Sequence, residues 1–134
     1  MRVIEILAAS LCLIATTSFG APSDAAQGAA TGWVALVDSG AYAKSWAQAG
    51  RQFQTHITAD GWAKAAAPAR EPLGAVVTRS IESNEAATSL PGAPDGDYRV
   101  FKFHTQFANK HDAVETVVVE QEAGGWKVDG YFIR

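Results

Sequence analysis

The chain has 134 residues and a formal net charge of −3, and 48% of its residues are hydrophobic. This length is typical of a single domain, and the hydrophobic fraction is sufficient for a packed core. Because the charge is slightly acidic and no dense basic run occurs, we expect no nucleic acid partner.

The N-terminus has the features of a secretory signal peptide. Arg2 precedes an apolar run over residues 6–15, and small residues follow as far as Gly20. A basic start, a short apolar stretch and a small-residue exit together direct export. We therefore predict a signal peptide over residues 1–20, with cleavage after Ala25 as an alternative.

A signal peptide predicts that the mature protein is exported, to the periplasm or to the extracellular medium. The apolar run is shorter than the ~20 residues that a membrane span needs, so we expect no transmembrane segment in the mature chain. Cys12 is the one cysteine and lies within the predicted signal peptide, so no disulfide is expected after cleavage.

A flexible leader and then helices are predicted next. Residues 21–30 are small and polar without apolar periodicity, which predicts the leader, and a single domain then covers residues 31–134. Gly40 should end the first helix, because glycine readily adopts the left-handed conformation that follows helix ends. Thr58 is expected to cap a later helix that ends at Pro68. The apolar positions with helical spacing are Trp33, Leu36, Val37, Tyr42, Trp46, Ala49 and Phe53.

The second half of the chain predicts an antiparallel sheet. Residues 74–83 alternate between apolar and polar, and segments 98–108, 114–122 and 126–133 follow as three successive strands. A long loop over residues 84–97 joins the first strand to the second. The predicted fold class is therefore α+β, with N-terminal helices packed on a curved antiparallel sheet of four or more strands.

The register of the strands depends on the turns. A turn over residues 109–112 would pair Phe107 with Val114 and Thr105 with Thr116. The face toward the helices would then contain no carboxylate before Glu120, near the strand end. It would carry Phe101, Phe103, Thr105, Phe107, Val114, Thr116, Val118, Trp126, Val128 and Phe132, with Glu115 pointing outward.

The opposite face of the predicted sheet is not uniformly polar. Val117, Val119, Tyr131 and Ile133 interrupt the alternation expected of a solvent face. An exposed apolar patch of this kind indicates an interface, for a homodimer or for another protein partner. Ordinary β-propensity is the alternative explanation.

Searches for reactive groups find no catalytic set. The three histidines, His56, His104 and His111, lack the spacing of metal ligands, and no nucleotide-binding or nucleophile motif occurs. We therefore predict no metal site, no cofactor and no assigned catalytic residue. Arg79 departs most from its surroundings, because it shares a strand face with Val77 and Ile81. It is either an ion-paired side chain at the sheet rim or a group that binds an anion.

Several segments resemble a known family. They are WVALVDSGAYAKSW at residues 33–46, REPLG at 70–74, LPGAPDGDY at 90–98, FANK at 107–110 and GYFI at 130–133. On these segments the chain resembles domain-of-unknown-function family 4019, within the nuclear-transport-factor-two-like (cystatin-like) superfamily. The resemblance implies a cystatin-like cone of helices and sheet, and it implies no particular reaction. It also favours the bacterial periplasm over the extracellular medium as the destination of the exported protein.

Three functional hypotheses follow. The leading one is a non-catalytic module that binds a small apolar or anionic ligand, or a protein partner. Its pocket candidates are Tyr42, Trp46, Arg79, Phe103 and Thr105, although helical spacing also suits Tyr42 and Trp46 for the core. The first alternative is a dimeric scaffold or docking protein that uses the outer sheet face. The second is an isomerase- or dehydratase-like enzyme, which needs a carboxylate beside Tyr42 or Thr105 in the cavity.

Overall fold

The computed structural model describes residues 22–134; the predicted signal peptide and Cys12 lie outside the described residues. The elements are α1 (Pro22–Asp38), α2 (Tyr42–Gln48), α3 (Arg51–His56), α4 (Ala59–Arg70), the 3-10 helix η1 (Glu71–Leu73), β1 (Val76–Ala87), β2 (Tyr98–Phe107), β3 (Lys110–Glu122) and β4 (Gly125–Ile133). None of the helices in this part of the chain has the length and apolar character needed to cross a bilayer.

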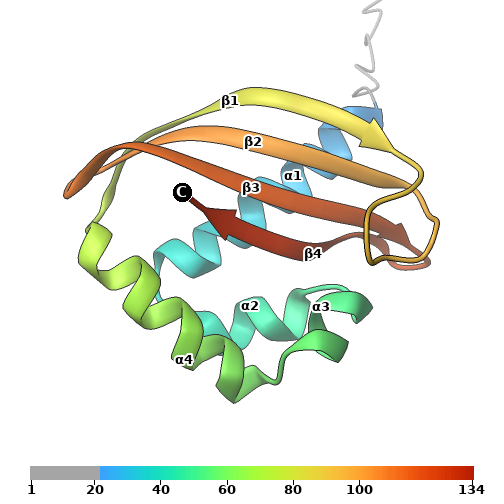
Figure 1. Ribbon diagram of the computed structural model, residues 1–134, viewed down its shortest axis with the longest axis horizontal. Coiled ribbons are helices and arrows are strands. Elements are labelled where there is room, and N and C mark those ends of the chain that lie inside the picture. Colours follow the sequence, from blue (N-terminus) through green and yellow to red (C-terminus); the bar gives the residue numbers. More distant parts are fainter. Residues whose placement is uncertain (1–21) are drawn as a thin grey trace, which may run out of the picture.

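The strands form one antiparallel sheet in the order β1-β2-β3-β4. Figure 1 shows that the sheet is long and curved, that α1 crosses it, and that α2, α3 and α4 lie together toward its β4 side. Helix α1 packs against β2, β3 and β4. The predicted α+β architecture, with helices packed on a four-stranded antiparallel sheet, is confirmed.

An aromatic cluster fills the space between the helices and the sheet. The ring centroid of Trp33 lies 5.6 Å from those of Phe53 and Trp62 and 5.4 Å from that of Tyr131. The buried indoles are also satisfied: Trp33 Nε1 donates to the Ser45 carbonyl at 2.8 Å, and Trp62 Nε1 donates to Ser45 Oγ at 2.9 Å. Ser45, on α2, therefore accepts hydrogen bonds from both α1 and α4 and links these two helices.

Helix boundaries follow the local signals in the sequence. Gly40 has a φ of 75° and ends α1, with hydrogen bonds from Gly40 N to Val37 O and from Ala41 N to Leu36 O. Thr58 caps α4, because its hydroxyl accepts from Gly61 N at 3.0 Å. The helix continues past Pro68 to Arg70, two residues beyond the predicted end.

The prediction of a flexible leader is wrong for residues 22–30. These residues form the first half of α1, in which Ala26 and Ala30 are fully buried against the core. Alanine has the highest intrinsic helix propensity, and its small side chain allows close packing. A segment of small residues was therefore helical without showing an apolar stripe.

The predicted register between the second and third strands is also wrong. Phe107 pairs with Lys110, Thr105 with Ala113 and Phe103 with Glu115, so Ala108 and Asn109 alone form the turn. The turn is fixed by hydrogen bonds from Ala108 N to Ala75 O and from Asn109 N to Leu73 O, each 2.8 Å long. Because side chains alternate along a strand, this change inverts β3.

The inversion moves the predicted interface residues to the face that packs on the helices. Val117 and Val119 are 0% exposed, so the prediction that they lie on the outer face is wrong. In β4 an irregularity between the pairs Val118↔Gly130 and Val119↔Val128 leaves Asp129 as an extra residue. Tyr131 and Ile133 therefore share the inner face, while Phe132 points outward and is 62% exposed.

Candidate functional site

A buried network of charged and hydroxyl groups lies on the inner face of the sheet, centred on Glu115. Its carboxylate is 0% exposed and accepts hydrogen bonds from Arg79 Nε at 2.8 Å, from Thr105 Oγ1 at 2.5 Å and from the Tyr131 hydroxyl. Arg70 Nη1 lies 3.9 Å from the Glu115 carboxylate and donates to Tyr131 Oη at 3.2 Å. The Glu115 carboxylate, on β3, is therefore surrounded by side chains from the other three strands and from α4.

Asp38 is the second carboxylate of the network, at the end of α1. Its Oδ1 accepts from Arg70 Nη2 at 2.5 Å and from Arg79 Nη2 at 2.9 Å, and its Oδ2 accepts from Arg79 Nη1 at 2.7 Å. The Asp38 side chain is 24% exposed, whereas that of Arg70 is 5% exposed. The two carboxylates and two guanidiniums balance in charge, and only the Asp38 end reaches solvent appreciably.

Burial and neighbouring charges shift the pKa values of Asp38 and Tyr131 in opposite directions. Burial alone would raise the pKa of Asp38, but hydrogen bonds from Arg79 and Arg70 outweigh it and hold the pKa below its ordinary value. Burial and the nearby Glu115 carboxylate raise the pKa of Tyr131, so its hydroxyl stays protonated. Arg70 also lies over the Phe107 ring, with its Cζ 4.9 Å from the ring centroid.

A pocket of about 380 Å³ opens beside the exposed end of this network, and we call it the Asp38 pocket. It is lined by Val37, Asp38, Ser39, Gly40, Tyr42, Arg70, Glu71, Gly74 and Ala75. These residues come from the ends of α1 and α4, the start of α2, and the segment that leads into β1. The volume lies within the range of roughly 300–1,000 Å³ typical of small-molecule sites.

The predicted pocket residues do not all line one cavity. Tyr42 lines the Asp38 pocket, and Arg79 reaches the same network from β1. Phe103 and Thr105 are buried in the core, at 1% and 0% exposure. Trp46 packs on the core and donates from Nε1 to the Ile57 carbonyl at 2.8 Å. Whether any of them contacts a ligand stays a prediction.

A separate acidic cluster lies where α3 meets the β3–β4 hairpin. Carboxylate oxygens of Glu120, Glu122 and Asp129 lie within 4.8 Å of one another. Gln52 Nε2 donates to Glu120 Oε2 at 2.7 Å and contacts Asp129 Oδ2 at 3.2 Å. Burial and the two neighbouring carboxylates raise the pKa of Asp129 to about 8. Three such groups could hold a cation, but no other feature of the described residues points to one.

Sequence reasoning missed the central role of Glu115 because the register was inverted. Ala113, Glu115, Val117 and Val119 form a face that alternates as regularly as the one chosen, so alternation along β3 alone could not select the register. The enzyme hypothesis required a carboxylate beside Thr105, and Glu115 lies at that position. Both oxygens of its carboxylate nevertheless accept hydrogen bonds from other side chains, and the Glu115 side chain is closed to solvent.

These features define a class: an α+β protein whose sheet carries a buried, charge-balanced network beneath a helical layer. Residues 29–131 match the protein family described as "Protein of unknown function (DUF4019)". The chain belongs to this family. A comparison with curated proteins finds no match.

Proposed function

We propose that this protein is an exported, non-catalytic module that binds a small ligand in the Asp38 pocket. The observation that carries the proposal is a pocket of about 380 Å³ with Asp38 and Arg70 in its wall. Tyr42 and Val37 supply apolar surface beside those charged groups. Charged groups placed beside apolar surface in a concave site can fix the orientation of a small molecule.

The state of the carboxylates supports a binding role over catalysis. A general base must accept a proton near the working pH, and its pKa must therefore lie near that value. The pKa of Asp38 is instead held below its ordinary value by two arginines. Glu115 has no free approach for a substrate, because its side chain is 0% exposed.

Export is part of the proposal and is supported by the sequence of residues 1–20. Arg2, the apolar run and the small residues before Gly20 form the expected three-part signal. A fusion of residues 1–25 to a reporter that is active only outside the cytoplasm tests this directly. We expect the fusion to show reporter activity. As the matched control, changing Leu11 and Leu13 to Arg should abolish that activity.

A thermal-shift screen with a small-molecule library tests the ligand pocket. A ligand present at 100 times its Kd should stabilise the folded chain by about 2.7 kcal/mol. Ala75 lines the pocket and takes no part in the charged network, so Ala75→Phe should fill the space and abolish the shift. Ala86→Phe, at an exposed position of β1, is the matched control and should retain it.

Two results would contradict the proposal. One is that no compound stabilises the wild-type chain. The other is that compounds that stabilise it act equally on Ala75→Phe, since ligand contact would then lie elsewhere.

A docking role for the outer sheet face is the second candidate, and the exposure of Phe132 favours it. Phe132 is 62% exposed and pairs with Thr116, next to the half-buried Val118. This is a different patch from the one predicted through Val117 and Val119. Sedimentation equilibrium should show a dimer that Phe132→Lys converts to a monomer; a wild-type monomer would exclude self-association through this face.

A further inference from the structure

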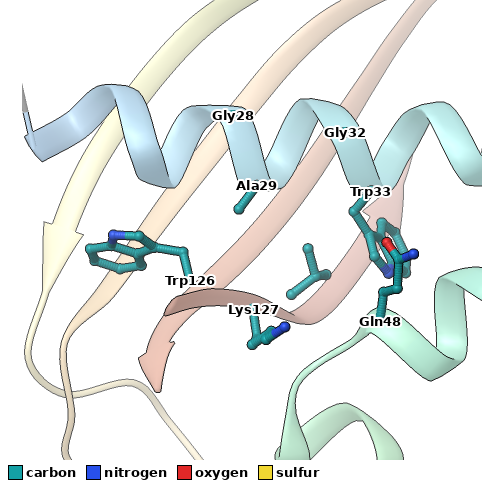
Figure 2. Close-up of a pocket in the computed structure, with 8 residues that line it drawn as sticks. Gly28, Ala29, Gly32, Trp33, Gln48, Trp126 and Lys127 are labelled. Carbon is teal, nitrogen blue, oxygen red and sulfur yellow. The ribbon is translucent and has the colours of Figure 1, made fainter. Parts of the chain in front are cut away.

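A second pocket, of about 270 Å³, lies between α1 and β4 and is separate from the Asp38 pocket. It is lined by Gly28, Ala29, Gly32, Trp33, Gln48, Trp126, Lys127 and Val128, and we call it the Trp126 pocket. Figure 2 shows the Trp126 ring at one end, Trp33 and Gln48 at the other, and Lys127 between them, with α1 running across the pocket.

The wall formed by α1 leaves room for a flat group. A Cβ added at Gly28 or at Gly32 would meet nothing within 4 Å, so the space beside both glycines is open. Trp126 is only partly buried and packs against the edge of the core. An indole ring near a wall made of two glycines and the small Ala29 side chain is suited to stacking an aromatic or other planar group.

The charge in the lining of this pocket is positive. Lys127 is the one charged side chain in the lining, and it joins none of the ion pairs formed among residues 22–134. Gln48 adds an exposed amide. The nearest acidic positions along the strands, Glu120 and Asp129, line other pockets. A lining with a cation and no carboxylate complements an anion.

The indole N–H of Trp126 differs from the other three. Trp33, Trp46 and Trp62 each donate from Nε1 to a protein oxygen. Among the hydrogen bonds of the described residues none comes from Trp126 Nε1, and this atom is not sealed from solvent. It is therefore an available donor at the edge of the pocket, and its resonance is a natural reporter of occupancy.

We propose that the Trp126 pocket binds small organic anions with a planar apolar body, such as aromatic carboxylates. The body stacks between Trp126 and the glycine-containing face of α1, and the carboxylate faces Lys127 and Gln48. This site and its ligand class are independent of the proposed function, since the two pockets share no lining residue.

Titration with sodium benzoate, followed by the four indole N–H signals in a proton–nitrogen correlation spectrum, tests the proposal. Trp126→Phe assigns the reporter signal. Benzoate should shift it saturably, and uncharged benzamide should bind about tenfold more weakly, as expected when a hydrogen bond loses its charge. Lys127→Gln should lower benzoate affinity by a similar factor, whereas the control Lys102→Gln, on β2, should leave it unchanged.

Blocking the pocket gives a second test that does not depend on charge. Gly32→Leu should place a side chain in the open space and abolish the benzoate shift. The Trp46 and Trp62 indole signals, from side chains outside the pocket, should stay in place, which would show that the fold is kept. Ala75→Phe should not affect benzoate binding, so failure in one pocket is distinguishable from failure in the other.

The proposal is overturned if benzoate produces no saturable shift of the Trp126 signal up to its solubility limit. Equal affinity for benzamide would refute the anion preference, and unchanged binding by Gly32→Leu would place the ligand outside this pocket.

Discussion

Replacing Glu115 with glutamine is the sharpest test of the buried network. The substitution keeps the size of the side chain and removes its negative charge. Arg70 and Arg79 would then share the single carboxylate of Asp38, and the Tyr131 hydroxyl would lose its charged acceptor. Breaking a buried ion pair from one side typically costs about 3–5 kcal/mol, because it leaves a charge without compensation.

That loss is large for a domain of this size, whose total stability is expected to be about 5–15 kcal/mol. Urea unfolding followed by tryptophan fluorescence should therefore show a much lower midpoint for Glu115→Gln with little change in slope. Glu85→Gln, at an exposed position of β1, is the matched control and should stay within about 0.5 kcal/mol of wild type. A loss below about 1 kcal/mol for Glu115→Gln would refute the reasoning, since it would mean that the two arginines do not need this carboxylate.

Three further substitutions test individual features by urea unfolding. The pKa of Asp129 is raised from 3.8 to about 8 by burial and by Glu120 and Glu122, so the folded chain keeps a proton that the unfolded chain releases. The stability that this proton supports is fully present below about pH 4 and is lost as the pH rises through about 8. Asp129→Asn should remove this part of the pH dependence of the unfolding free energy. An unchanged pH profile would contradict the raised pKa. Gly40→Ala should cost about 1–2 kcal/mol, because Gly40 has a φ of 75°, and a neutral effect would show that the turn rearranges. Thr58→Ala should cost about 1 kcal/mol through loss of the α4 cap, whereas Thr55→Ala, at an exposed helical position, is its control.

The parts of the fold that the sequence predicted are those set by local chemistry. Gly40 and Thr58 mark helix ends through their own backbone and hydroxyl groups, and the structure uses both as expected. The alternation of β2 likewise depends on the strand alone. Such signals need no knowledge of distant residues, which is why a single sequence reveals them.

The strand register could not be predicted because it depends on contacts from elsewhere in the chain. The turn at Ala108 and Asn109 lacks the glycine that marks a tight hairpin, and neither residue has a positive φ. The amides of these two turn residues donate to the carbonyls of Ala75 and Leu73, more than thirty positions earlier. Thr105 pairs with Ala113 instead of the predicted Thr116, and this odd-numbered shift of three positions exchanges the two faces of β3 and places Glu115 on the inner face.

Arg79 shows which part of the candidate site was accessible from sequence. A guanidinium on a strand face with Val77 and Ile81 signals a buried partner, and an ion pair was one of its two interpretations. The structure supplies Asp38 and Glu115 as those partners. Their identity required the tertiary fold, because Asp38 is 41 positions away from Arg79 in the chain.

The position of Asp38 connects the network to the pocket. A carboxylate at the last residue of a helix is unfavourable next to the negative end of the helix dipole, and α1 has no basic residue in its last turn. Arg70 and Arg79 supply the missing positive charge from α4 and β1. Residues that violate a local rule and are compensated by tertiary contacts tend to occur at functional sites. Here the compensation ties the ends of α1 and α4, two of the segments that form the walls of the Asp38 pocket, to β1, and this helps to hold the pocket in shape before any ligand arrives. A ligand that enters it therefore loses little affinity to the ordering of the protein, which is the condition under which a small site can bind usefully.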